Sequence, residues 1–193
     1  MAKTVTFAIQ GIAPFSFSKP IVDKKKTGEL PDKFEERSWR DRIHVNADGH
    51  AFIVPMAIKL CLTDCAKFLS ETIPGKGKNT FTKHFKAGIM VTAPMVLEYH
   101  NGKQILAKDI IGEALFLPSN GRAGDGTRVW RTYPVVPEWQ THGEIHLIDP
   151  VLMDKPEKVR EYLEHAGNFI GLGRFRPINN GFYGRFKVTE FSG

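Results

Sequence analysis

The sequence predicts an α+β fold, in which an antiparallel sheet carries two helices on one face. Two amphipathic helices and several strand-like segments alternate in the order strand, helix, strand, strand, helix, strand. A glycine-rich loop, residues 171–187, separates the second helix from the last strand. This order is typical of the ferredoxin-like, split βαβ arrangement, here with insertions.

Each predicted strand either alternates apolar and polar residues or is rich in β-forming residues. The predicted strands span residues 4–12, 88–99, 128–136, 139–148 and 185–191. In the first strand Val5, Phe7 and Ile9 share one face, which predicts a half-buried strand.

The two predicted helices carry apolar residues at helical spacing. The first begins at Pro55 and runs to residue 70, and the second begins after Asp154, a predicted N-cap, and ends at Gly171. The stripe of the first helix contains Ile58, Cys61, Leu62, Cys65 and Leu69. The stripe of the second contains Val159, Tyr162, Leu163, Ala166 and Ile170.

The connecting segments are polar and rich in turn residues. Residues from about 20 to 50 form a polar insertion that we expect to be mobile or partly helical. Asp48-Gly49 predicts a hairpin turn within it. A basic loop is predicted over 75–86 and a second loop over 118–126, whereas 103–117 stay unassigned.

Composition predicts one cytoplasmic domain spanning residues 1–193. Apolar residues make up 41% of the chain and charged residues 25%, as in globular proteins, and no segment predicts a secretory signal or a membrane span. The formal charge of +6 favours anionic partners. Cys61 and Cys65 are expected to be buried thiols, because no second ligand pair with zinc spacing follows them. We expect neither a cofactor nor a metal.

The glycine-rich loop combines four glycines, four aromatic residues and four cations, with no acidic residue. Arginine presents a planar fork to phosphate oxygens, aromatic faces stack on bases, and glycine lets a ligand approach the backbone. The mixture is typical of a site for single-stranded nucleic acid. A glycine-rich turn with ordinary surface arginines is the alternative interpretation.

Three segments resemble the RAMP superfamily, the RRM-like proteins that process or coat guide RNA in CRISPR systems. They are the loop 171–186 between the second helix and the last strand, the first strand 5–14, and the helix start 51–59. The resemblance implies an RRM-like fold that binds RNA in preference to DNA, with an open sheet face as the family's usual binding surface. It implies a small solitary member, of the kind that phage genomes encode.

We expect a groove in which cations follow phosphates and aromatic rings stack on bases. The expected nucleic-acid contacts are Arg174, Phe175, Arg176, Tyr183, Arg185, Lys187, Lys76, Lys78, Lys83, His84, Lys86, Arg122, Arg128 and Trp130. Taken singly, each cation is also explained as solvated surface, and each aromatic residue as part of the core.

Three functions are compatible with these features. The first is a non-enzymatic, sequence-tolerant protein that binds single-stranded RNA or DNA and forms a homo-oligomer along it. The second is a metal-independent endoribonuclease that uses a histidine, for which the candidates are His44, His84, His142 and His146. The third is an assembly or inhibitor protein that acts on CRISPR-type complexes.

Overall fold

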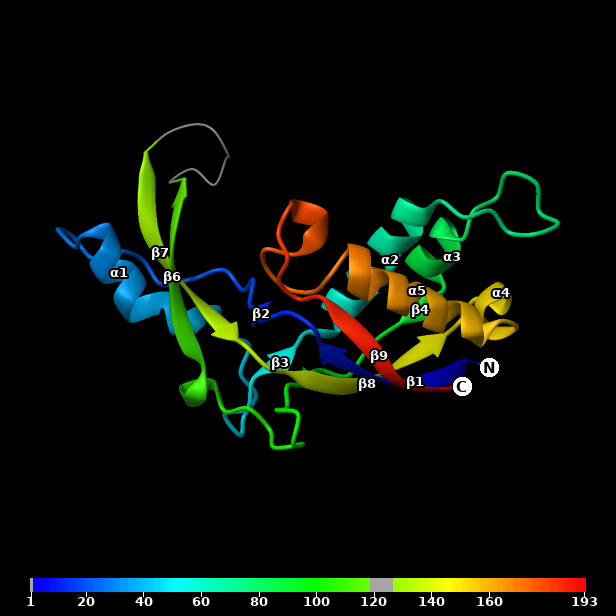
Figure 1. Ribbon diagram of the computed structural model, residues 1–193, viewed down its shortest axis with the longest axis horizontal. Coiled ribbons are helices and arrows are strands. Elements are labelled where there is room, and N and C mark those ends of the chain that lie inside the picture. The colour runs from blue at the N-terminus through cyan, green and yellow to red at the C-terminus, as the bar shows by residue number, and fades with distance from the viewer. Residues whose placement is uncertain (1, 119–126) are drawn as a thin grey trace.

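The computed structural model describes residues 2–118 and 127–193 and has the predicted α+β class (Figure 1). The strands are β1 Lys3–Gly11, β2 Phe15–Ser16, β3 Phe52–Ile53, β4 Ile89–Met90, β5 Met95–Val96, β6 Ile111–Pro118, β7 Arg128–Val136, β8 Gln140–Leu147 and β9 Phe186–Ser192. The helices are α1 Pro31–Ser38, α2 Pro55–Leu69, α3 Thr82–Ala87, α4 Pro150–Met153 and α5 Pro156–Phe169, with short 3-10 turns η1 Trp39–Arg42, η2 Ala107–Asp109 and η3 Pro177–Asn179.

The main sheet has four antiparallel strands in the order β4-β8-β1-β9. β1 pairs with β8 from Lys3 opposite Leu147 to Gln10 opposite Gln140, and with β9 on its other edge. Helices α2 and α5 lie together over one side of this sheet (Figure 1). The elements β1, α2, β4, β8, α5 and β9 therefore follow one another as the sequence predicts.

The apolar stripes of the two main helices meet the inner face of β1 in one core. Val5, Phe7 and Ile9 are each at most 3% exposed, and every predicted stripe residue of α5 is buried. The stripe of α2 is also buried, except that Leu69 at its end is partly exposed. Both cysteines lie in this core, and burial raises the pKa of Cys65 to about 12.

A second, three-stranded sheet has the strand order β2-β7-β6 and lies beside the main sheet and its helices. The hairpin of β6 and β7 extends away from helices α2 to α5, and α1 lies beside β7 (Figure 1). The unassigned segment 103–117 thus contributes η2 and most of β6.

The predicted strand 88–99 is two short strands with different partners. β4 pairs with β8, whereas β5 pairs with β3. Between them lies Pro94, which has no amide hydrogen with which to continue a ladder. The hairpin predicted at Asp48-Gly49 is also shorter than expected. Its turn is present, with Gly49 at φ +84°, and a single antiparallel β-bridge joins Val45 to Ala51.

Two local predictions about helices are wrong. The end of the basic loop 75–86 belongs to α3, because Phe81 and Phe85 pack against the ring of Tyr162, with centroids 5.9 and 4.3 Å away. Asp154 does not cap α5, because it closes the preceding turn α4 instead. That turn is capped by Asp149, whose Oδ1 accepts a hydrogen bond of 2.9 Å from the amide of Val151.

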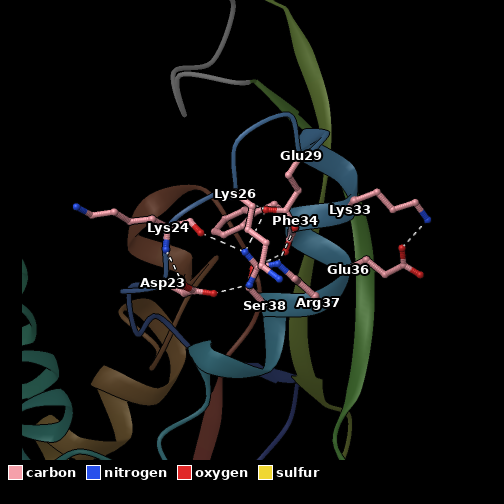
Figure 2. A network of polar contacts seen from close by, with 9 residues as sticks. All are labelled: Asp23, Lys24, Lys26, Glu29, Lys33, Phe34, Glu36, Arg37 and Ser38. Carbon is pink, nitrogen blue, oxygen red and sulfur yellow. Dashed lines mark hydrogen bonds and ion pairs between the residues drawn. The ribbon is translucent and has the colours of Figure 1, made fainter.

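The polar insertion is partly helical, as one of its two predicted states. α1 and η1 carry a buried ion pair in which Arg42 Nη2 lies 2.9 Å from Glu35 Oε2. On the outer side of α1, Arg37 contacts Asp23 and donates to Glu29 at 2.6 Å (Figure 2). These contacts fasten the segment before α1 to the helix.

No helix in the described ranges combines the length and the apolar character that crossing a bilayer requires.

We predict that the titration of Glu29 reports the Arg37 contact. The hydrogen bond from Arg37, followed by that from the Lys26 amide, lowers the pKa of Glu29 from 4.5 to about 2. Because the folded pKa is depressed, the contact stabilises the fold above about pH 4.5, and this contribution is lost as the pH falls through about 2. Arg37→Gln should return the carboxyl titration, followed by NMR, towards 4.5. Lys33→Gln, which breaks the separate pair with Glu36, should leave it unchanged.

Candidate nucleic-acid interface

The glycine-rich loop folds back on itself between the β6–β7 hairpin and the main helices (orange to red in Figure 1). Leu172 donates to the carbonyl of Gly184 at 3.0 Å, and Tyr183 donates to that of Phe175 at 3.0 Å. Two further amides fix the loop to the segment after β1. Arg174 donates to Ser16 at 2.8 Å and Gly184 to Pro14 at 2.7 Å.

Glycines are needed here because the loop packs against the protein's own backbone. Gly184 has φ +69°, and a Cβ built on it would lie 1.8 Å from the carbonyl oxygen of Leu172. At Gly173, with φ +73°, the Cβ would lie 2.2 Å from the carbonyl oxygen of Ser16. The expectation that these glycines admit a ligand is therefore wrong at both positions, where they admit another stretch of the same chain.

A groove of about 580 Å³ lies between this loop and the beginning of α2. One wall is formed by Val54 and the first turns of α2, and the other by residues 172–176 and Asn179. No side chain caps α2, and its first turn carries no acidic residue. A helix beginning carries a partial positive charge, so this wall favours an anion. Its amides add little, because Pro55 has no amide hydrogen and the amide of Ala57 donates to the carbonyl of Val54 at 2.9 Å.

Arg174 and Arg176 both line the groove but have different partners. Arg176 Nη2 lies 3.5 Å from Asp64 Oδ2, and both side chains are about one quarter exposed. Arg174 has no carboxylate partner among the described residues, and its guanidinium lies over aromatic rings instead. The loop is therefore only partly neutralised by the protein itself.

The two aromatic residues of the loop predicted to contact bases lie in different places, one at the groove and one in the interior. Phe175 lines the groove with φ +55°, a costly conformation for a bulky residue. Tyr183 is only 6% exposed and donates to Glu113 at 2.6 Å; burial and then this bond raise its pKa to about 12. The prediction that Tyr183 stacks on a base is wrong, because its ring packs inside.

The predicted lysines and His84 lie at the other end of α2. Lys76 and Lys78 are exposed in the turn before α3, and Lys83 and Lys86 are exposed on α3 itself. A helix of fifteen residues is about 20 Å long, so these cations do not share the groove with the arginines.

His84 turns inward, in contrast to its predicted role at the surface. Its Nδ1 lies 2.9 Å from Asp149 Oδ2, and its side chain is 11% exposed. Its Nε2 is buried without a hydrogen-bond partner in the described part of the chain. Residues on one turn of α3 face opposite ways, which a loop prediction does not anticipate.

The remaining predicted contacts are scattered. Arg128 and Trp130 lie on β7, where the indole is 60% exposed and packs against Phe116. Arg185 donates to the carbonyl of Asn168 at 2.9 Å, and Lys187 lies opposite Gln10 in the sheet. Arg122 lies outside the described residues.

The open face of the main sheet is acidic. A shallow groove of about 600 Å³ there is lined by Glu144 and Glu190 together with His142 and small residues. Glu98 borders the adjoining hollow beside His142 and Glu190. Because three carboxylates face this surface, it repels a polyanion, and the open sheet face that the resemblance predicts as the binding surface is a poor candidate here.

The histidine candidates for cleavage also lie apart from the arginine groove. On the open face His146 contacts Thr4 at 2.9 Å and Glu144 at 3.4 Å, and His142 lies 3.9 Å from Glu98. His44 lies against Phe52, and burial lowers its pKa. Within the described ranges no three His, Cys, Asp or Glu side chains form a group that could hold a metal. Histidine-dependent cleavage stays an untested prediction.

Sequence reasoning missed three residues that shape the groove. Met56 and Leu60 are about half exposed on α2 and give its wall an apolar lining, and Tyr133 lies beneath Arg174. Met56 and Leu60 fall outside the apolar stripe of α2, so the sequence pattern could have indicated that they are exposed apolar residues. Tyr133 is distant in sequence from the loop, and nothing in the pattern connects them.

Solved structures of CRISPR proteins have the same fold. One is a chain of the Type III-B Cmr-β complex bound to cognate target RNA, with a TM-score of 0.57 at 11% identity. The match covers 99% of this chain but only 60% of that one. The other is Cmr6 from Pyrococcus furiosus, with a TM-score of 0.50 at 11% identity and 98% of both chains covered. No family model and no curated protein matches the sequence. The predicted RAMP-like fold is confirmed.

We predict that close packing around a glycine, rather than its positive φ alone, determines how much a substitution there destabilises the protein. Gly184→Ala should lower the free energy of unfolding by more than 2 kcal/mol, since it combines backbone strain with overlap of Leu172. Gly102→Ala is the matched control, because Gly102 has φ +82° but nothing within 4 Å of its Cβ. Its cost should be about 1 kcal/mol. Equal effects in urea denaturation would contradict the packing explanation.

Proposed function

We propose that the protein binds single-stranded nucleic acid, RNA in preference to DNA, in the groove between α2 and the glycine-rich loop. The observation that carries this proposal is Arg174, which lines the groove and whose guanidinium has no carboxylate partner in the described part of the chain. The beginning of α2 on the opposite wall adds the partial positive charge of the helix dipole.

The groove beside α2 and the groove on the open sheet face are lined by opposite charges. Arg174 and Arg176 are the charged residues that line the groove at α2, whereas Glu144 and Glu190 line the one on the open sheet face. A polyanion is attracted to the first and repelled by the second. The proposed path of the strand therefore runs along the helix side of the molecule.

Selectivity for sequence is expected to be weak. The guanidinium groups contact phosphates, which are the same at every nucleotide. Phe175, Met56 and Leu60 offer apolar surface to any base. The preference for RNA is supported by the likeness in fold to a chain of a complex solved with target RNA.

We predict that alanine at either groove arginine weakens binding to all sequences alike. Loss of one charge-assisted contact to phosphate should cost about 1.5 kcal/mol, or about tenfold in Kd. It should also reduce the slope of log K against log salt by about 0.7, the value for one neutralised phosphate of a single strand. Fluorescence anisotropy with labelled RNA at two ionic strengths measures both quantities.

The control is Arg160→Ala, because Arg160 is exposed on α5 and paired with Glu164. Its binding should equal that of the wild type, within the small change that one net charge produces. Matched single-stranded DNA and duplex RNA complete the comparison. Binding that does not weaken between low and moderate salt, or Arg174→Ala that binds like the wild type, contradicts the proposal.

A further inference from the structure

Tyr133 joins three parts of the chain that are distant in sequence. It lies on β7, is 1% exposed, and has the Arg174 guanidinium over its ring, 4.5 Å from the centroid. The ring of Phe175 meets it edge-on, with centroids 5.1 Å apart at 90°. The guanidinium of Arg42, from η1 in the polar insertion, also lies over the Tyr133 ring, at 4.8 Å.

Arg42 is itself fixed by the buried carboxylate of Glu35. Its Nη2 donates to both carboxylate oxygens, at 2.9 and 3.2 Å, and both side chains are less than 10% exposed. Arg131 on β7 reaches the same carboxylate at 3.7 Å. A buried charge does not leave its partner without a large cost, so this pair fixes α1 to η1 within the insertion. The contacts of Glu35 with Arg131 and of Arg42 with the Tyr133 ring then connect the insertion to the hairpin.

The two arginines of the groove are therefore held by different means. An ion pair with Asp64 holds Arg176. Arg174 lacks such a pair among the described residues, so the aromatic faces of Tyr133 and Phe175 are what restrict its guanidinium. A planar guanidinium stacks on a ring, whereas a lysine ammonium does not keep the same orientation.

We infer that Tyr133 is a positioning residue, which holds the Arg174 fork in the orientation that receives a phosphate, with Arg42 of the insertion behind it. This presupposes the proposed binding of RNA in the groove. A preordered fork loses less conformational freedom when it binds. The insertion thereby acquires a role in binding, although none of residues 20–50 lines the groove.

The first experiment exchanges each groove arginine for lysine and measures Kd for single-stranded RNA. Lysine keeps the charge but not the stacked plane. Arg174→Lys should weaken binding about tenfold, nearly as much as Arg174→Ala, whereas Arg176→Lys should stay within about threefold of the wild type. The pair is matched, because both substitutions are at half-buried sites of one loop. Arg174→Lys with wild-type affinity overturns the inference.

The second experiment needs no RNA. The side-chain protons of Arg174, at Cδ and Nε, should have upfield-shifted NMR resonances from the Tyr133 ring, and Tyr133→Phe should retain the shift. Tyr133→Leu should reduce it to the part that the more distant Phe175 ring contributes; if that variant does not fold, the wild-type shift and the lysine pair still decide. Unshifted Arg174 resonances in the wild type overturn the positioning role. A wild type with shifted resonances that fails to bind RNA overturns the proposed function instead.

Discussion

The glycine-rich loop depends on the hydrogen bonds that tie it to the segment after β1. The amide of Gly184 donates to the carbonyl of Pro14, and the amide of Arg174 donates to that of Ser16. The segment that follows β1 therefore fixes the position of the loop. Because Gly173 and Gly184 have no side chain, the loop backbone packs closely against the carbonyl groups of Ser16 and Leu172. The loop is consequently packed against the rest of the protein. Its fixed backbone determines the direction of each of its side chains.

This packing sorts the loop's side chains into inner and outer groups. Tyr183 turns towards Glu113 of β6 and is buried, while Phe175 and both arginines line the groove beside α2. The positive charge therefore collects at the beginning of α2, about 20 Å from the lysines near its end. The carboxylates Glu144 and Glu190 lie on the opposite face of the sheet. A chain whose total charge is only +6 thus has one hollow suited to an anion and another that disfavours it.

The sequence was most informative where burial follows a simple period. The stripes of α2 and α5 and the alternation of β1 are set by one residue type at one spacing, and all are present. Prediction failed where the partner is remote. Whether 88–99 is one strand or two depends on β3 and β8, and whether Tyr183 is exposed depends on Glu113, seventy residues earlier. His84 was misplaced because an inward and an outward side chain alternate within one turn of α3. The loop's composition predicts the positive charge of the groove, but three-dimensional packing alone decides which of its aromatic rings line that groove.

The insertion illustrates how a polar segment becomes structural. Glu35 on α1 and Arg42 on η1 are charged residues in a segment with few apolar positions, and their burial is tolerable only because each satisfies the other. Once paired, they place a guanidinium over Tyr133, whose ring also contacts Arg174. A contiguous chain of contacts then runs from α1 through β7 to the groove. Since each contact in it is specific for a planar cation, a carboxylate or an aromatic ring, composition alone does not reveal it, and conservative exchanges such as arginine for lysine are not neutral along its length.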